Sequence, residues 1–109
     1  MTAARRSRLS QSGRILAMAG TRVVGLAAYE RSDREMRVTE LGVDADSAGG
    51  ADQIVGGLLD ALELSCMASG ARRMVLLPRA TQAIAVLHRR GYVSIGDGPA
   101  GSWFEKTFV

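Results

Sequence analysis

Few residues in this chain have the types and spacing that catalysis or metal binding requires. Cys66 is the only cysteine and His88 is the only histidine. A disulfide within the chain is therefore excluded, and so is an ordinary zinc site, which needs about four such ligands. Cys66 falls on the flank of a predicted helix with no base beside it. We expect it to act as a small core residue and not as a nucleophile.

The charge balance favours anionic ligands without naming one. The chain has 14 basic and 11 acidic residues, a net charge of +3 and a pI near 9.8. Nucleotides, coenzyme A and nucleic acid are all anions that such a surface attracts, although a plain preference for arginine gives the same balance with no ligand. A nucleic-acid-binding role would use Arg5, Arg6, Arg8, Arg14, Arg72, Arg73, Arg89 and Arg90. No nucleic-acid-binding motif accompanies them and aromatic residues are scarce, so nucleic acid ranks last among the partners.

The length of the chain and the composition of its first residues indicate how it is divided into a tail and a domain. A length of 109 residues suffices for one domain with one modest core. Residues 1–13 are polar and rich in arginine, so we expect a flexible basic tail before a single domain over residues 14–109. No apolar run approaches the roughly 18 residues of a membrane span, and no long apolar stretch follows the basic start. We therefore expect a cytoplasmic protein without membrane contact.

Hydrophobic periodicity predicts a sheet that begins with antiparallel strands. Residues 15–19 and 22–29 are apolar runs separated by Gly20-Thr21, which predicts a β-hairpin. Residues 36–43 alternate with a period near two, as a further antiparallel strand does. Strands in succession with no helix between them form a meander.

Two helices and further strands are expected after the meander. Residues 44–53 predict a loop, and apolar residues at three- and four-residue spacing then predict a helix that ends near Gly70. Residues 74–77 predict a strand buried on both faces. The next helix is expected from Thr81 to Gly91, before a closing strand pair. The whole order predicts an α+β fold.

Two glycines interrupt the first predicted helix at Gly56-Gly57. Each costs about 1 kcal/mol against alanine in a helix interior. Close approach of a neighbouring strand or of a ligand would explain their presence.

Several short motifs, taken in this order, resemble the GNAT family of N-acetyltransferases. Residues 22–27 (RVVGLA), 40–43 (ELGV), 56–63 (GGLLDALE) and 83–92 (AIAVLHRRGY) each look like a family motif, and the resemblance covers residues 14–109. It implies a mixed sheet with an antiparallel N-terminal meander and two helices packed on the sheet. It also implies transfer of an acetyl group from acetyl-CoA to an amine.

The resemblance also assigns candidate site residues. It implies that Glu40 is the general base that accepts the amine proton. It places acetyl-CoA across the backbone of Leu41, Gly42 and Val43, and it implies no metal. The alternative for Glu40 is an exposed strand carboxylate paired with an arginine such as Arg37.

The pyrophosphate of the cofactor would bind at Gly49 and Gly50. Glycines let backbone N–H groups approach phosphate oxygens, and the N-terminus of a helix adds a favourable dipole. This loop departs from the family pattern, because it has no arginine and because Asp52 adds a negative charge near the expected phosphates. An acidic residue also suits the start of a helix that binds no ligand.

Two further departures bear on catalysis. The family's first strand and first two helices, which help to form its acceptor site, are missing. Leu87 stands where the family has a tyrosine that protonates the leaving thiolate. The adjacent His88 points about 100° away from that position. His88 as general acid and His88 as an ordinary surface residue both stay open.

A catalytically inactive binding or regulatory module of the same fold explains both the motifs and the losses. A sheet that lacks its first strand exposes an edge, and such an edge can pair with another chain. We therefore expect a homodimer, or a complex with a protein partner, formed through this edge. Acetyl transfer from acetyl-CoA to an unnamed amine is the first function expected, and the inactive module is the alternative.

Overall fold

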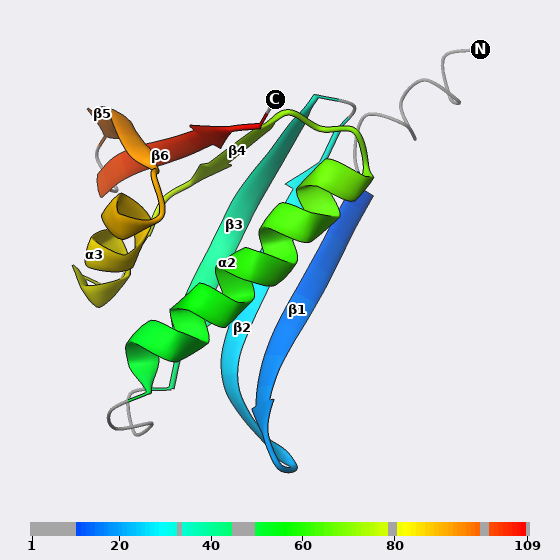
Figure 1. Ribbon diagram of the computed structural model, residues 1–109, viewed down its shortest axis with the longest axis vertical. Helices are drawn as coiled ribbons and strands as arrows, with labels where there is room; N and C mark the ends of the chain where they lie inside the picture. The colour runs from blue at the N-terminus through cyan, green and yellow to red at the C-terminus, as the bar shows by residue number, and fades with distance from the viewer. Residues whose placement is uncertain (1–10, 33, 45–49, 79–80, 99–100, 109) are drawn as a thin grey trace.

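The computed structural model describes residues 11–32, 34–44, 50–78, 81–98 and 101–108. Its elements, shown in Figure 1, follow in the order β1 (Gln11–Ala19), β2 (Arg22–Arg31), β3 (Glu35–Val43), α2 (Ala51–Ala68), β4 (Arg73–Leu76), α3 (Thr81–Arg89), β5 (Val93–Gly98) and β6 (Gly101–Thr107). The predicted order of strands and helices is confirmed. β1 starts before residue 14, so residues 11–13 of the predicted tail are strand, and the earlier part of that tail lies outside the described residues.

The strands form one mixed, six-stranded sheet in the order β1-β2-β3-β4-β6-β5. β1, β2 and β3 are the predicted antiparallel meander. β4 lies parallel to β3, and β6 pairs antiparallel with both β4 and β5. β1 and β5 are therefore the two edges of the sheet in the described part of the chain.

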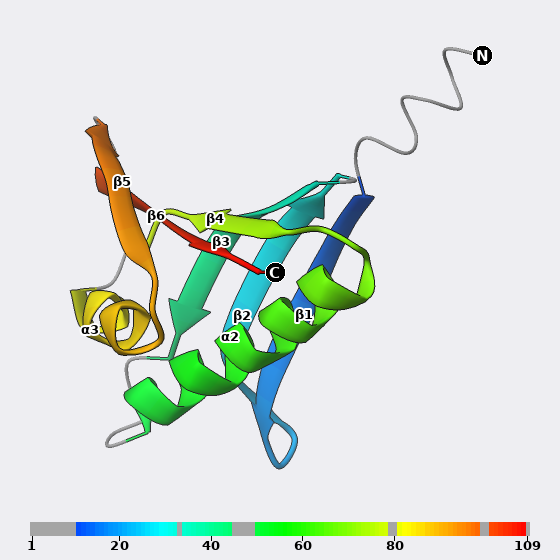
Figure 2. The same ribbon diagram turned by 45° about the horizontal axis from the view of Figure 1, so that its top comes forward.

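Both helices contribute to one core on the same face of the sheet, as Figures 1 and 2 show. α2 runs across β1, β2 and β3, and α3 lies beside α2. Leu59 and Leu62 of α2 and Leu87 of α3 are 0% exposed, and full burial of each such side chain contributes about 1.5–3 kcal/mol. Among the described residues no helix covers the opposite face of the sheet, which we call the open face.

Gly25 of β2 lies in close contact with side chains of α2. A Cβ atom there would lie 2.7 Å from Ile54 Cγ2 and 3.1 Å from Leu58 Cδ1. Of the two explanations offered for Gly56-Gly57, close approach of a neighbouring strand is wrong, and close approach of a ligand stays a prediction. A Cβ at Gly56 would have only the Arg90 guanidinium near it, at 3.9 Å, and one at Gly57 would have nothing within 4 Å. The sheet, and not the helix, supplies the glycine that the contact needs.

The predicted C-terminal ends of both helices are confirmed, whereas α2 starts earlier than predicted. Gly70 and Gly91 come after the two helices with φ of 84° and 87°, a conformation that glycine adopts without steric cost. α2 begins at Ala51, earlier than the apolar periodicity indicated, with Gly50 as its N-cap.

β3 and β4 separate part-way along β3 (Figure 1). Their parallel pairing runs over residues 35–38 of β3 and 73–76 of β4, where β4 ends. β3 continues to Val43 and pairs there only with β2. Beyond Val38, the side of β3 that faces away from β2 therefore has no strand partner in the described structure.

A β-bulge marks the same place on β3. Ala28 of β2 pairs with Glu40, but the next residue, Tyr29, pairs with Val38. Thr39 is therefore the extra residue, and a bulge of this kind redirects side chains and leaves backbone groups unpaired.

Candidate functional site

Glu40 lies in a row of three side chains on the open face. In β2, Ala27 is 0% exposed and belongs to the core under the helices, so its neighbour Ala28 points to the open face. Arg14 of β1 and Glu40 of β3 pair with Ala28 from its two sides. Directly opposed residues in a sheet share a face. Arg14 and Glu40 therefore stand on either side of a single methyl group.

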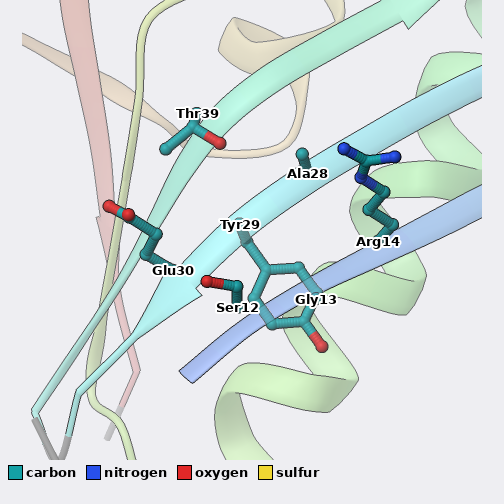
Figure 3. Close-up of a pocket in the computed structure, with 7 residues that line it drawn as sticks. All are labelled: Ser12, Gly13, Arg14, Ala28, Tyr29, Glu30 and Thr39. Carbon is teal, nitrogen blue, oxygen red and sulfur yellow. The ribbon is translucent and has the colours of Figure 1, made fainter. Parts of the chain in front are cut away.

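A hollow of about 330 Å³ lies beside this row. The lining residues, drawn in Figure 3, come from three adjacent strands: Ser12, Gly13 and Arg14 from β1, Ala28, Tyr29 and Glu30 from β2, and Thr39 from β3. The small side chain of Ala28 leaves room among longer neighbours. Hydroxyl groups and a carboxylate in this lining can accept hydrogen bonds from an ammonium or amine group. The hollow therefore suits a small polar molecule.

Glu40 stands at the margin of this hollow. It pairs with Ala28 and follows Thr39, and both of these residues line the hollow. Glu40 is an exposed strand carboxylate, as the alternative expected, but its pairing with Arg37 is wrong, because Arg37 pairs with Glu35 at 3.4 Å. In the described part of the chain the exposed Glu40 carboxylate has no ion-pair partner.

The residues predicted to lie along acetyl-CoA form the unpaired stretch of β3. The Leu41 side chain is 7% exposed and belongs to the core, so Leu41 offers a ligand only its backbone. A Cβ atom at Gly42 would meet nothing within 4 Å, so space lies open beside that residue. Unpaired backbone groups along a strand bind extended molecules that carry amides, by adding them as a further strand.

The predicted pyrophosphate loop is described only at its end. Gly49 lies outside the described residues, whereas Gly50 is the N-cap of α2 and forms no side-chain capping hydrogen bond. No side chain at the N-cap therefore occupies the N–H groups of the first turn, which attract anions. Asp52, in the same turn, pairs with Arg89 of α3 at 3.2 Å, and both side chains are more than half exposed. Arg89 therefore offsets part of the negative charge of Asp52, which lies near the expected position of the cofactor phosphates.

α3 supplies no acid at the position where the family has its tyrosine. Leu87 is 0% exposed and belongs to the core. The neighbouring His88 is exposed, and its ring meets that of Phe104 edge to face with 5.4 Å between centroids. Phe104 belongs to the core on the helix-covered face, so His88 does not lie at the hollow.

A buried polar cluster, which the sequence did not predict, joins α2 to the segment that follows α3 and to β6. Tyr92 donates a hydrogen bond from its hydroxyl to Glu63 Oε2 at 2.7 Å. Lys106 Nζ lies 3.4 Å from both carboxylate oxygens, and an Arg90 nitrogen lies 3.7 Å from Oε1. Arg90 also pairs with Asp60. The cluster lies on the helix-covered face, so we assign it to stability and not to the hollow.

Burial controls the chemistry of this cluster and of the cysteine near it. Tyr92 is 2% exposed. Burial, together with the hydrogen bond to the Glu63 carboxylate, raises the pKa of the Tyr92 hydroxyl far above its ordinary value. Burial likewise raises the pKa of the Cys66 thiol, which agrees with its expected role as a core residue. Only one feature of the sequence pointed to this cluster. Glu63 follows Leu62 at the border of the apolar stripe of α2, where a carboxylate can become buried.

The described residues hold no group of three or more His, Cys, Asp or Glu side chains placed to bind a metal ion. None of the helices in the described ranges is long and apolar enough to cross a membrane. The cytoplasmic location and the division into tail and single domain stay predictions.

Comparison with known proteins gives a match only at the level of structure. No protein-family profile matches the sequence, and no curated protein matches it. The PaiA N-acetyltransferase of Thermoplasma acidophilum, solved in complex with coenzyme A, superposes with a TM-score of 0.79 at 14% identity, over 97% of this chain and 66% of that chain. An acetyltransferase from Bacillus cereus ATCC 14579 gives 0.72 at 20% identity, over 93% and 76% of the two chains.

A third solved structure shares the same architecture. The aminoglycoside 6′-N-acetyltransferase from Enterococcus faecium superposes with a TM-score of 0.72 at 16% identity, over 90% of this chain and 73% of that chain. The chain therefore has the α+β fold of the GNAT acetyltransferases, as the order of motifs predicted. Identities this low establish the fold, and each neighbour's activity remains a statement about that neighbour.

Proposed function

We propose that this protein is an acetyl-CoA-dependent N-acetyltransferase that acts on an amine. The observation that carries the proposal is the meeting of two features at the bulge of β3. One is the stretch of β3 beyond Val38 that has no strand on one side among the described residues. The other is the hollow on the open face, with Glu40 at its margin.

The unpaired stretch of β3 fits the acyl donor. The pantetheine arm of coenzyme A is extended and carries amides, so the backbone of Leu41, Gly42 and Val43 would hold it as a strand partner would. The first turn of α2 would face the phosphates of coenzyme A, because its N-cap, Gly50, forms no side-chain hydrogen bond with the N–H groups of that turn. When bound, acetyl-CoA supplies the acyl group activated as a thioester.

The hollow fits the acceptor. Hydroxyls of Ser12 and Thr39 and the carboxylate of Glu30 would orient an amine. Glu40 would remove a proton from the nitrogen as that nitrogen bonds to the acyl carbon and the carbon–sulfur bond breaks. Unpaired backbone N–H groups of β3 would stabilise negative charge on the acyl oxygen. The thiolate would leave without help from α3, since Leu87 is buried.

Calorimetric titration of the purified protein with acetyl-CoA at moderate salt, with ATP as an anion control, tests the donor half of the proposal. We expect micromolar binding of acetyl-CoA and much weaker binding of ATP. Equal binding of the two, or no binding of acetyl-CoA, would overturn the enzyme proposal, because the charge of the chain alone would then account for any affinity.

The role of Glu40 is tested by Glu40→Gln, with acetyl-CoA turnover measured against a panel of amines. A general base contributes about 10²–10⁴-fold to a rate, so we expect a loss of this size in kcat with acetyl-CoA affinity unchanged. Asp97→Asn, on the far edge strand β5, is the control and should keep full activity. Equal activity of the wild type and Glu40→Gln would remove Glu40 from the mechanism.

The second candidate is an inactive binding or regulatory module of the same fold. The buried Leu87 favours it, because α3 then lacks the acid that the family resemblance leads us to expect. In that case the protein would act through dimerisation or a protein partner. Specific acetyl-CoA binding without turnover of any amine in the panel would support this role over catalysis.

A further inference from the structure

We infer that two copies of this chain pair along β1, and that the second copy forms the outer wall of the hollow. This inference concerns assembly, and it holds whether or not the hollow binds an amine. It extends the expectation of an edge-mediated dimer to a particular strand, a particular register and a shared site.

The two edges of the sheet differ in their protection against pairing. β5 has six residues, contains Gly96, Asp97 and Gly98, and is bulged against β6. Short, bulged and charged edges resist the addition of another strand. β1 has nine residues, no proline and a single charged residue, Arg14. Its one irregularity places the extra residue, Val24, on β2, so β1 itself keeps regular alternation.

The open face of β1 exposes large apolar side chains, as β5 also does at Val93 and Ile95, so the two edges differ in length, regularity and charge and not in apolar exposure. Leu16 is 52% exposed and Met18 is 51% exposed. Leu16 lies directly opposite Leu26 of β2, which continues the apolar surface toward the centre of the sheet. A second strand added outside β1 would cover these side chains and satisfy the outward backbone groups of β1, and contiguous exposed apolar surface commonly marks such contacts.

The sequence of β1 favours one register for an antiparallel pair related by a two-fold axis. With Ile15 opposite Ile15 of the second copy, all nine residues of the strand are paired. Arg14 then faces Leu16 of the second copy, and the two isoleucines form a β-branched cross-strand contact. A register centred on Arg14 would place two guanidinium groups directly opposite each other, which is destabilising.

The helices leave room for this pairing. α2 contacts β1, β2 and β3 alike and is therefore centred over β2. In the dimer the two β2 strands would lie three strand spacings apart, about 14 Å. Packed helices need only about 8–10 Å between their axes, so the two α2 helices would lie side by side without overlap.

The second copy would complete the hollow. Ser12 and Arg14 line the hollow from the outermost described strand. In the register centred on Ile15, Met18 of the second copy faces Ser12, and Leu16 of the second copy faces Arg14. Each hollow then gains an apolar wall from the other chain, and the two hollows of the dimer lie on the same face of a continuous sheet.

Sedimentation of the full chain over a range of concentrations tests the surface. We expect a wild-type dimer, and for Leu16→Lys a dissociation constant at least about tenfold higher, since each lysine would face an arginine across the interface. Leu16→Glu, which faces the same arginine with an opposite charge, should dimerise more tightly than Leu16→Lys. Leu64→Lys, on the 66% exposed outer side of α2, is the control. A monomeric wild type, or equal dissociation constants for both Leu16 variants, would overturn the inference.

Oxidative cross-linking tests the register. Directly opposed Cα atoms lie about 4.5–5.5 Å apart, within the range of a disulfide, so Ile15→Cys should form a cross-linked dimer. Met18→Cys should not, because its counterpart in the second copy lies far along the strand, and the native Cys66 is 0% exposed. Efficient cross-linking through Met18→Cys but not through Ile15→Cys would overturn this register. The acetyl-CoA titration is independent of both measurements, so failure of the dimer and failure of the proposed enzyme are distinguishable.

Discussion

Tyr92 holds its hydroxyl against the Glu63 carboxylate in the interior, and this contact links the stability of the fold to alkaline pH. The pKa of Tyr92 is raised in the folded state above its ordinary value near 10. The unfolded chain therefore loses this proton first as pH rises. Stability from this group is complete below about pH 10 and declines as the pH rises above it.

We expect Tyr92→Phe to remove this alkaline dependence. Between pH 10 and pH 11 the free energy of unfolding of the wild type should fall by about 1 kcal/mol more than that of the variant. At pH 7 the variant should be less stable by about 1.5–3 kcal/mol, because a hydrogen bond to a charged group is lost. Urea unfolding at pH 7, 10 and 11 measures both effects. Cys66, whose pKa is also raised, acts in the same direction in both proteins and cancels in the comparison.

For single residues, the sequence predicted burial better than it predicted hydrogen-bond and ion-pair partners. The burial of Cys66 was predicted and is confirmed, since cysteine favours the core. The hydrogen bond between Tyr92 and Glu63 joins residues on different elements, and no local pattern encodes such a contact. Arg37 pairs with Glu35 and not with Glu40, and periodicity does not reveal which of these carboxylates an arginine on the same strand selects.

At the scale of elements, the fit between α2 and the sheet depends on a missing side chain. Gly25→Ala would place a methyl group 2.7 Å from Ile54 Cγ2, and overpacking of this kind costs about 1–3 kcal/mol. Gly57→Ala adds the same methyl group where nothing lies within 4 Å, and it should stabilise the helix by about 1 kcal/mol. Thermal and urea unfolding of the two variants should therefore move in opposite directions. Stabilisation by both would show that α2 shifts readily to accept the extra methyl group.

The elements themselves were predictable because their signals are local. Alternation in β3 and three- and four-residue spacing in α2 follow from which face each element buries. Gly70 and Gly91 end helices through their own backbone conformation. The separation of β3 from β4 is different, because it depends on where two distant segments stop pairing. Periodicity does not reveal such a feature.

The whole molecule is one sheet covered by helices on a single face in its described part, so its two faces have different roles. The helix-covered face holds the core and the Glu63 cluster, whereas the open face holds the hollow and Glu40. A chain of this size buries a modest share of its surface, so each added contact matters. Pairing along β1 would add both backbone hydrogen bonds and apolar burial.

The stability of the whole molecule should therefore depend on protein concentration. Association of folded chains stabilises them by mass action, so the Tm of the wild type should rise as the concentration is raised. Leu16→Lys should show a smaller rise, because lysine facing Arg14 weakens the association. Scanning calorimetry over a hundredfold range of concentration, on the wild type, Leu16→Lys and the control Leu64→Lys, measures the three slopes. A wild-type Tm that does not change with concentration would mean that the β1 edge stays unpaired, and the hollow would then have to work with the wall that one chain provides.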